Sequence, residues 1–419
     1  MADLLPSGRS PDKEFLDFIR SPETIRERCQ RLLTLGREGR LAHFKVQDDR
    51  LKSIADRVIT VTKKTYPTFD IPFHSRWRHF EAGGRDRATQ LDGLLKGTSR
   101  EDQARARFEL TITSVLLDAG AGPTWQYREV DSGKAYARSE GLAVASYDMF
   151  VAGVFSSQPK NRLMADGAGL AQFSVDKLAL GFQVTTSNPL VGLEGRCGLI
   201  RSLAAALSAQ PQVFTRQGVT RLGHLFDHLA AQAKNQVLPC RAILAAVLET
   251  LGSIWPGRLT YGGVNLGDVW HHSALGAEGS LKALVPFHKL SQWLTYSLIE
   301  PFEVAGIKIV GVDQLTGLPE YRNGGLLLDG GVLEAKHRDV TEKRWAPGDE
   351  VIVEWRALTV GLLDEIGRAV QNALGKSSDE LPLAKVLQGG TWTAGREIAA
   401  EKRPGGAPPI TIESDGTVF

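Results

Sequence analysis

The 419-residue sequence is poor in cysteine: Cys29, Cys197 and Cys240 are far apart, and no CxxC pair occurs. This scarcity excludes a disulfide framework and a cysteine-rich zinc site. No stretch of about eighteen uninterrupted apolar residues is present, so no membrane-spanning helix is predicted. The first twenty residues lack the basic-then-apolar order of a secretion signal. These absences predict a protein of the reducing cytoplasm without a membrane partner.

An excess of charge is also missing. The formal net charge is +2, with 23% charged and 42% hydrophobic residues, as in an ordinary globular protein. A near-neutral chain is poorly suited to binding polyanions, so nucleic acid is not an expected partner. The adjacent His271 and His272 point about 100° apart on a helix, and no HExxH pattern accompanies them. We therefore predict no metal and no cofactor.

Hydrophobic periodicity predicts a mainly α protein with a small C-terminal β element (α+β). We expect one large helical domain over residues 1–395, a β-rich segment near 305–356 and an irregular tail over 396–419. Within the β-rich segment, the apolar run Val351–Trp355 is typical of a strand. No internal repeat and no linker-like boundary is evident.

The segment from Leu284 to Gly331 is the most informative. Its first half predicts a helix that begins at Pro286 and ends at Pro301. One arc of this helix is apolar and includes Trp293, whereas the opposite arc carries neutral polar residues: His288, Ser291, Gln292, Thr295 and Tyr296. Such an arc suits a pocket wall that binds a polar, mostly uncharged ligand, or a buried helix whose polar groups bond internally.

A polar loop is expected next, over residues 313–325. It contains Glu320, Tyr321, Arg322 and Asn323, with a proline and two adjacent glycines, and an apolar run then leads to Asp329. A stiff loop of this kind can deliver several polar groups to one point.

Two further segments carry candidate binding residues. Residues 72–87 interleave aromatic, arginine and histidine residues, including Arg76, Trp77 and Arg78, which suits an anion site or an arginine-rich surface turn. In a predicted helix over 138–150, Glu140 lies eight residues from Asp148 on roughly the same side. Two such carboxylates serve acid–base chemistry, or are solvated or salt-bridged.

Several long motifs together resemble one known family, the fungal and bacterial uracil-catabolism proteins long catalogued as a domain of unknown function. The similarity extends from about residue 20 to 395. The motifs are Ser75–Phe80 (SRWRHF), Leu116–Gly122 (LLDAGAG), Arg138–Leu142 (RSEGL), Asn188–Leu190 (NPL), Leu193–Arg196 (LEGR), Pro286–Leu294 (PFHKLSQWL) and Gly317–Gly325 (GLPEYRNGG). In general character, without matching motifs, the helical plan also resembles queuosine-salvage nucleosidases and the DNA-glycosylase-like fold.

The resemblance implies a role in the pyrimidine-degradation route that passes through ribosylurea and releases urea. It implies no set of catalytic residues. A step of that route must break the bond between C1′ of ribose and a urea nitrogen, through an oxocarbenium-like state that needs carboxylates. The small-molecule substrate is thus derived from a nucleoside or nucleotide.

We assign candidate roles from the residues themselves. The candidate catalytic residues are the carboxylates Asp329 and Glu320, together with His288. His288 and Gln292 are also candidates for binding urea or the sugar. Arg76 and Arg78 are candidates for clamping a phosphate, with Trp77 or Trp293 excluding water. The wider candidate binding set also includes Glu140, Tyr321, Arg322 and Asn323.

Two other functions stay open. One is an amidohydrolase or deaminase that acts on a ring-opened uracil nucleotide, although most such enzymes use a metal or a cysteine nucleophile. The other is a non-catalytic partner of the pathway, which would need no inward-facing polar side chains.

Overall fold

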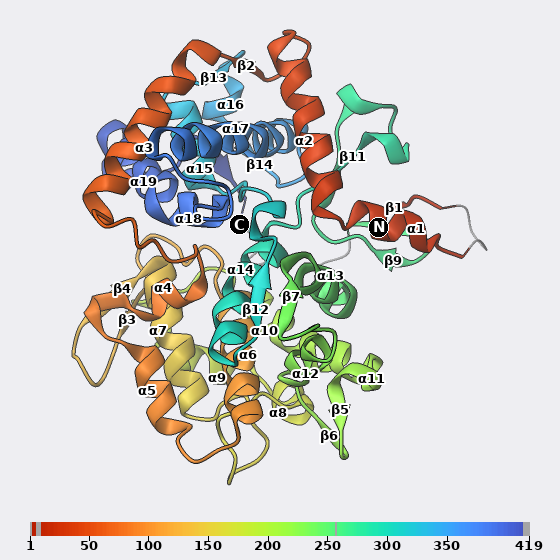
Figure 1. The fold of residues 1–419 in the computed structure, drawn as a ribbon, viewed down its shortest axis with the longest axis vertical. Helices are drawn as coiled ribbons and strands as arrows, with labels where there is room; N and C mark the ends of the chain where they lie inside the picture. Colours follow the sequence, from red (N-terminus) through yellow and green to blue (C-terminus); the bar gives the residue numbers. More distant parts are fainter. Residues whose placement is uncertain (1, 6–9, 256–257, 414–419) are drawn as a thin grey trace. The chain divides into compact units, whose positions relative to one another are not determined.

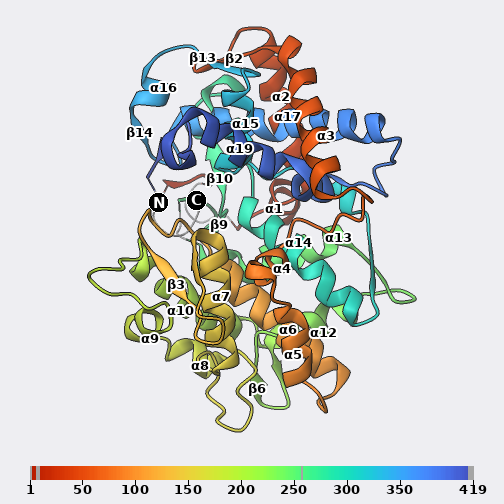
Figure 2. The ribbon, with the colours of Figure 1, turned by 90° about the vertical axis from the view of Figure 1, so that its left-hand side faces the viewer.

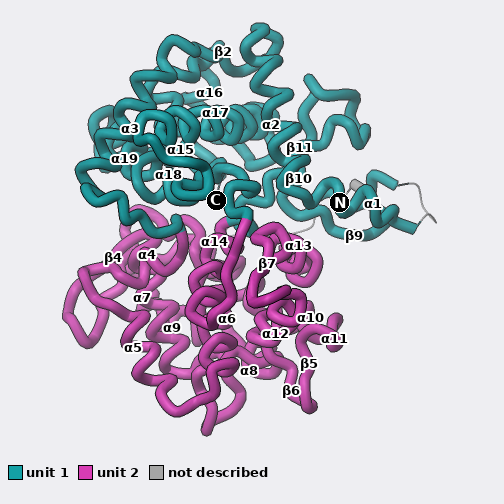
Figure 3. Tube along the Cα trace, in the orientation of Figure 1, with its two compact units in different colours: residues 1–74, 257–292, 311–413 teal, residues 75–256, 293–310, 414–419 magenta. Residues whose placement is uncertain are grey.

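The computed structural model describes residues 2–5, 10–255 and 258–413. Contacts divide them into two compact units (Figure 3). The described residues of unit 1 lie within 1–74, 257–292 and 311–413, and those of unit 2 within 75–256 and 293–310. The sequence predicted a single domain over 1–395. Each unit is assembled from separate stretches of the chain, and whether the two fold as one domain stays a prediction.

Unit 1 is organised around the long helix α17 (Glu350–Leu374), which packs against α2 (Pro22–Arg37), α3 (Leu51–Thr65) and α15 (Tyr321–Asp329) (Figure 1). Its other α-helices are short: α1 (Lys13–Ile19), α16 (Asp339–Glu342), α18 (Leu383–Val386) and α19 (Trp392–Lys402). Brief 3₁₀ turns are η1 (Asp48–Arg50), η4 (Ser273–Leu275), η5 (Leu281–Ala283), η6 (Val312–Gln314) and η8 (Pro404–Gly406). A π-helical turn, η7 (Leu387–Thr391), leads into α19.

Local signals explain how two of these helices begin or end. Ser21 caps α2 by accepting a hydrogen bond from the Thr24 amide at 3.1 Å, and Pro22 occupies the first helical position. Helix α17 ends at Gly375, whose φ of 63° is the left-handed conformation that glycine adopts readily.

The strand predicted over Val351–Trp355 is wrong, because these residues form the first turns of α17. All five side chains are buried. A helix end that is enclosed on every side shows no 3.6-residue periodicity, so its β-branched, apolar run cannot be told from a strand by pattern.

Unit 2 is built from packed helices around α6 (Arg100–Leu116), which contacts α4 (Arg76–Phe80), α7 (Arg138–Val151), α10 (Leu193–Ala209) and α12 (His224–Ala230) (Figure 2). The remaining helices are η2 (Ala82–Gly84), α5 (Arg87–Leu94), α8 (Gly167–Ala171), α9 (Val175–Gly181), α11 (Pro211–Phe214), α13 (Cys240–Leu251) and η3 (Gly252–Ile254).

The strands form small sheets, each within one unit. Unit 1 contains the parallel pair β1–β8 (Ala2–Asp3, Leu259–Tyr261) extended by β9 (Val264–Asn265), and the pairs β10–β11 (Val269–His271, Leu284–Pro286), β2–β13 (Phe44–Val46, Leu333–Ala335) and β14–β15 (Arg344–Trp345, Thr411–Ile412). Unit 2 contains β3–β4 (Gln126–Arg128, Ala135–Ala137), β5–β6 (Thr215–Arg216, Val219–Thr220) and β7–β12 (Val237–Pro239, Lys308–Val310). The mainly α class with a minor β part is confirmed, although the strands are spread along the chain and not confined to its C-terminal part.

The boundaries of the central helix differ from the prediction. Pro286 ends strand β11, and α14 (Lys289–Val304) begins three residues later and continues through Pro301. A proline within a helix leaves the carbonyl four residues earlier without its helical donor. Here the indole Nε1 of Trp77 donates to that carbonyl, of Ser297, at 3.0 Å. The replacement bond explains why Pro301 does not end the helix.

Two other predictions are corrected. The polar loop expected over 313–325 ends early, because Tyr321–Asp329 is helix α15 with Glu320 as its N-cap. The tail expected to be irregular from 396 begins inside α19, which extends to Lys402. The last six residues of that tail lie outside the described part. Among the described residues, no helix combines the length and the apolar character that crossing a membrane requires.

Candidate functional site

The candidate residues fall into two sets, one in each unit. Arg76, Trp77, Arg78, Glu140 and Trp293 belong to unit 2, and His288, Gln292, Glu320, Tyr321, Arg322, Asn323 and Asp329 belong to unit 1.

Arg76 is held rigidly in the core of unit 2. Its backbone amide donates to Ser297 Oγ at 2.9 Å, on α14, and its side chain is fully buried. Nε donates to Ser114 Oγ at 2.7 Å, and Ser114 is in turn 2.6 Å from Ser146 Oγ. Ser146 donates to the carbonyl of Ala143 at 3.0 Å. This chain of hydroxyl groups fixes the plane of the guanidinium.

The rest of the guanidinium faces the loop after α6 and the first turn of α7. Nη1 donates to Asp118 Oδ2 at 2.8 Å and to the Ser139 carbonyl at 3.2 Å. Nη2 is buried, and within the described part of the chain it has no hydrogen-bond partner. Burial lowers the pKa of Arg76, while Asp118 and Glu140 act in the opposite direction. A buried donor without an acceptor is costly and calls for an explanation.

Asp118 is positioned by a second buried arginine. Arg196, on α10, donates from Nη1 to the Leu117 carbonyl at 2.5 Å and from Nη2 to the Gly120 carbonyl at 2.8 Å. Burial lowers the pKa of Arg196 to about 10, although Asp118 lies close enough to raise it. Arg196 therefore fixes the loop that presents Asp118 to Arg76.

Aromatic and acidic groups complete this cluster. The Trp293 ring centroid lies 5.8 Å from the Arg76 guanidinium carbon and 5.8 Å from the His79 ring centroid. Glu140 lies in the first turn of α7, where the N-cap Ala137 provides no side-chain cap. We call Arg76, His79, Asp118, Glu140 and Trp293 the Arg76 cluster. It brings together three residues predicted from sequence: Arg76, Glu140 and Trp293.

Arg78 is engaged differently. Its Nη1 lies 2.7 Å from Glu81 Oε1, and its Nη2 is hydrogen-bonded to Glu300. Ser75 also donates to Glu300, at 2.6 Å, and burial raises the pKa of this glutamate against the lowering effect of Arg78. A phosphate at Arg78 would have to compete with two carboxylates. Trp77, in turn, supports α14 through its bond to Ser297.

In unit 1, Glu320 caps helix α15. Its carboxylate accepts from the Arg322 amide at 2.7 Å and the Asn323 amide at 2.8 Å. Burial raises the pKa of Glu320, and the two backbone hydrogen bonds act against that rise. Asn323 is fixed through its side chain, which donates to the Leu318 carbonyl at 3.0 Å and accepts from Thr391 Oγ1 at 2.9 Å.

The other members of α15 lie further along the helix or point elsewhere. Arg322 donates to the Gly406 carbonyl at 3.1 Å, and its guanidinium carbon is 4.8 Å from the Tyr321 ring centroid. Asp329, in the last turn, is bound by both terminal nitrogens of Arg403, with Nη1 at 2.7 Å from Oδ1. The carboxylate of Asp329 is thus committed to an ion pair at the opposite end of the helix from Glu320.

The polar arc of α14 is buried, and two of its side chains bond internally. Gln292 donates to the Phe287 carbonyl at 3.0 Å and to Thr316 Oγ1 at 2.8 Å, and accepts from the Thr316 amide at 3.0 Å. His288 lies just before the helix, with Nε2 at 3.1 Å from the Ile19 carbonyl. Burial lowers the pKa of His288 to about 4. Of the two alternatives for this arc, these bonds favour a buried helix over a pocket wall.

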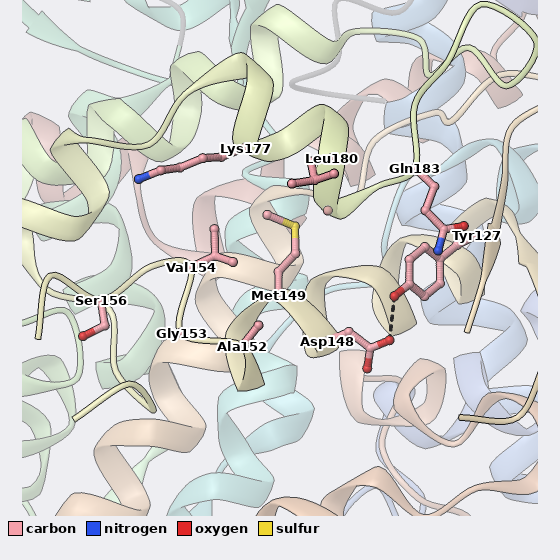
Figure 4. A pocket seen from close by; sticks show the side chains of 11 residues that line it. Tyr127, Asp148, Met149, Ala152, Gly153, Val154, Ser156, Lys177, Leu180 and Gln183 are labelled. Atoms are coloured by element: carbon pink, nitrogen blue, oxygen red, sulfur yellow. Dashed lines mark hydrogen bonds between the residues drawn. The ribbon is translucent and has the colours of Figure 1, made fainter. Parts of the chain in front are cut away.

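Unit 2 also contains an open cavity of about 530 Å³ between α7 and α9 (Figure 4). At one end, Tyr127 donates its hydroxyl to Asp148 Oδ2 at 2.6 Å, and at the other lie Lys177 and Ser156. Met149, Val154 and Leu180 form much of the wall. Burial raises the pKa of Asp148. Glu140 does not line this cavity, so the paired-carboxylate site suggested for one helix side is not formed there.

The adjacent histidines His271 and His272 have different partners. His271 Nε2 lies 3.1 Å from the Ala277 carbonyl, and His272 Nε2 lies 3.5 Å from Glu354 Oε2. Across the described ranges, no group of three or more histidine, cysteine, aspartate or glutamate residues is arranged to hold a metal ion.

Sequence reasoning missed Asp118, Ser114 and Arg196 as members of this site. Asp118 and Arg196 both occur in motifs that carried the family resemblance, but neither matches a known chemical motif. A signal was available in Asp118, which follows the C-cap of α6 directly and precedes the sequence Ala-Gly-Ala-Gly. An acidic residue near a helix C-terminus opposes the helix dipole and calls for a cationic partner.

Comparison with known proteins adds to this geometry. The family described as "Protein of unknown function (DUF1688)" matches residues 18–419. The chain is 38% identical to "Uracil catabolism protein 4" of Lachancea kluyveri, over 96% of this chain and 99% of that protein. It is 41% identical to "Protein urg3" of Schizosaccharomyces pombe, over 95% of this chain and 98% of that protein. These matches confirm the resemblance that the motifs indicated, and the chain belongs to the DUF1688 family.

Proposed function

We propose that this protein acts in uracil catabolism as an N-ribosyl hydrolase that releases urea from ribosylurea or its 5′-phosphate. The observation that carries the proposal is the match, over 96% of the chain, to a relative named uracil catabolism protein 4. In the proposed reaction, the oxygen of water bonds to C1′ of ribose as the bond from C1′ to the urea nitrogen breaks. That nitrogen takes up a proton while the attacking water gives one up, and the products are urea and ribose or ribose 5-phosphate.

Glu320 suits the general acid in this reaction. The leaving urea nitrogen must be protonated, and a carboxyl group does so best when its pKa is raised towards neutral pH. Burial raises the pKa of Glu320. The N-terminus of α15 holds the group in place through two amide hydrogen bonds.

His288 and Asp329 remain candidates with narrower roles. With a pKa of about 4, His288 is neutral at pH 7 and can act only through a neutral imidazole. Asp329 can stabilise the positive charge at C1′ only if it is released from Arg403, because that ion pair already neutralises it.

The test is to incubate metal-stripped protein with ribosylurea and with its 5′-phosphate, with and without chelator, and to measure free urea. We expect urea release that persists with chelator. Glu320→Gln should reduce the rate at least about 100-fold, as expected for loss of a general acid. Glu334→Gln is the matched control, because the exposed Glu334 bonds only to Lys45 and Gln47 on the surface.

Other outcomes point to the alternatives. Ammonia release from a ring-opened uracil nucleotide, without urea from either ribosylurea compound, would identify an amidohydrolase or deaminase. No turnover of any of these compounds, together with co-purification of another pathway enzyme, would indicate a non-catalytic partner. Full turnover by Glu320→Gln would remove Glu320 from the mechanism.

A further inference from the structure

The buried ion pair between Arg76 and Asp118 has an unused donor and an unused acceptor. The pair is joined through Nη1 and Oδ2 at 2.8 Å. The other guanidinium nitrogen, Nη2, is buried and has no acceptor among the residues that the structure describes. Over the same residues, the other carboxylate oxygen of Asp118, Oδ1, accepts no hydrogen bond.

Other bonds keep this donor and this acceptor in place. Nε of Arg76 is bound to Ser114, and Nη1 also reaches the carbonyl of Ser139. Arg196 holds the carbonyls on either side of Asp118, those of Leu117 and Gly120, at 2.5 and 2.8 Å. Arg76 therefore cannot turn without breaking several hydrogen bonds, and the backbone that carries Asp118 is fixed on both sides.

The charges around the pair disfavour a phosphate. The charge of Arg76 is already balanced by Asp118, and Glu140 adds a second carboxylate nearby. A phosphate dianion is usually bound by several charged donors, and here it would face the free oxygen of Asp118. The unused groups are the two N–H of Arg76 Nη2 and the Oδ1 oxygen of Asp118, on side chains that are joined through their other atoms. That arrangement complements a neutral planar group that presents C=O next to N–H.

We propose that the Arg76–Asp118 pair recognises a ureido group, with Arg76 Nη2 donating to its carbonyl oxygen and Asp118 Oδ1 accepting from its N–H. This inference rests on the proposed function for the choice of ligand, concerns residues of unit 2 alone, and assigns a ureido group, not a phosphate, to the Arg76 cluster. Ser139 and Glu140 are only half-buried, so one side of the cluster reaches solvent. The Trp293 ring beside the guanidinium provides an apolar surface that strengthens such hydrogen bonds by excluding water.

The experiment measures binding of N-methylurea by ligand-observed NMR, with inorganic phosphate as the competing probe, so that no turnover is needed. We expect the unmodified protein to bind N-methylurea and phosphate not to displace it. Asp118→Asn replaces one carboxylate oxygen with an NH2 donor and leaves the other oxygen without its negative charge. The substitution should weaken binding roughly 10- to 100-fold, as for loss of a hydrogen bond to a charged group. Arg76→Lys should weaken it similarly.

Arg87→Lys is the matched control. Arg87 is equally buried in unit 2 and is paired with Glu129, but its nitrogens are all used: Nε and Nη2 donate to Glu129 Oε1 at 3.0 and 2.7 Å, and Nη1 donates to the Phe80 and Ala82 carbonyls. Binding by this variant should be unchanged. Circular dichroism and thermal melting establish that each variant is folded, and if Arg76→Lys does not fold, the near-isosteric Asp118→Asn still decides.

The results separate this inference from the proposed reaction. Binding of N-methylurea that depends on Asp118, without urea release from ribosylurea, would keep the ureido site and reject the hydrolase. Urea release with N-methylurea binding that Asp118→Asn and Arg76→Lys leave unchanged would reject the ureido site alone. Displacement of N-methylurea by phosphate would also overturn it, in favour of an anion site.

Discussion

Each unit contains a buried pair of arginine and aspartate, and the two pairs differ in how fully they are bonded. In unit 1, Asp268 accepts four hydrogen bonds: from Arg356 Nη1 and Nη2, both at 2.8 Å, from Trp270 Nε1 at 2.7 Å and from the Lys289 amide at 3.0 Å. In unit 2, Asp118 accepts one hydrogen bond, from Arg76 at 2.8 Å.

The difference separates a structural pair from a candidate binding pair. Burial raises the pKa of Asp268, but Arg356 and the other donors outweigh this effect and hold that pKa well below its usual range. Asp268 accepts two hydrogen bonds on each oxygen, which leaves it little to offer a ligand, and it joins β10, α14 and α17. The Arg76–Asp118 pair is as well buried on its arginine side, yet it retains a donor and an acceptor at a fixed place. Counting the hydrogen bonds that each carboxylate accepts therefore distinguishes the pairs where burial alone does not.

The largest expected effect follows from breaking the Arg356–Asp268 pair. Asp268→Asn should lower the free energy of unfolding by about 3–5 kcal/mol, because it leaves Arg356 as an uncompensated buried charge. Urea-induced unfolding followed by circular dichroism measures this loss. A loss below about 1 kcal/mol would contradict the structural role of the pair, since a surface ion pair would give that result.

The corresponding substitution in the Arg76–Asp118 pair, Asp118→Asn, should affect stability less and turnover more than Asp268→Asn does. Asp118→Asn also deprives a buried arginine of its paired carboxylate, but Glu140 still acts on Arg76 and one hydrogen bond is disturbed instead of four, so we expect a smaller loss in stability, of about 1–3 kcal/mol. Urea release from ribosylurea should fall about 100-fold, equivalent to about 2.7 kcal/mol at the transition state. Steady-state kinetics of both variants, measured where both are folded, tests the contrast. Equal kinetic losses would abolish the distinction between the pairs.

Acid should lower the free energy of unfolding through His288, which lies near Asp268 in unit 1. Its folded-state pKa of about 4 lies below the unfolded value of about 6.5, so the proton favours the unfolded state. This contribution to stability is complete above about pH 6.5 and is lost as the pH falls towards 4. Between pH 7.5 and 5 the loss amounts to about 2 kcal/mol from this residue.

His288→Asn isolates that contribution, because asparagine tolerates the positive φ of 46° at this position and does not titrate. Unfolding in urea at pH 7.5 and 5.0 should show a pH-dependent loss about 2 kcal/mol smaller in the variant than in the unmodified protein. An identical loss in both would mean that His288 does not resist protonation in the folded state.

Much of the fold could be predicted where local signals act alone. The start of α2 is encoded by Ser21 and Pro22 alone, because capping is decided by neighbouring residues. Pro301 misled, because its effect depends on whether a distant donor compensates the carbonyl of Ser297, and Trp77 does so from a different helix. Val351–Trp355 misled because burial on all sides removes the periodic signal.

Residue type alone identified several members of the candidate site, but it did not identify the hydrogen bonds between them. Arg76, Glu140 and Trp293 were chosen separately, from arginine, carboxylate and aromatic chemistry, and the structure brings them together. Asp118 was missed because its importance lies in a hydrogen bond to a residue forty-two positions away. Gln292 was chosen as a ligand-binding residue, but Thr316 and the Phe287 carbonyl already use its amide. Which polar atoms remain unused depends on tertiary contacts that no local pattern encodes.

The smallest expected effect concerns Arg78, which the sequence predicted to clamp a phosphate together with Arg76. Arg78 is paired with Glu81 and Glu300, so its charge is already balanced as in an ordinary ion pair near the surface. Arg78→Lys keeps the charge and should change stability by less than about 1 kcal/mol. If Arg78 does not hold the phosphate, KM for ribosylurea 5′-phosphate should change less than about threefold, and the ratio of KM values for the phosphorylated and unphosphorylated substrates should stay constant. A tenfold rise confined to the phosphorylated substrate would instead support the phosphate clamp, and it would mean that substrate displaces Glu81 or Glu300 from Arg78 on binding.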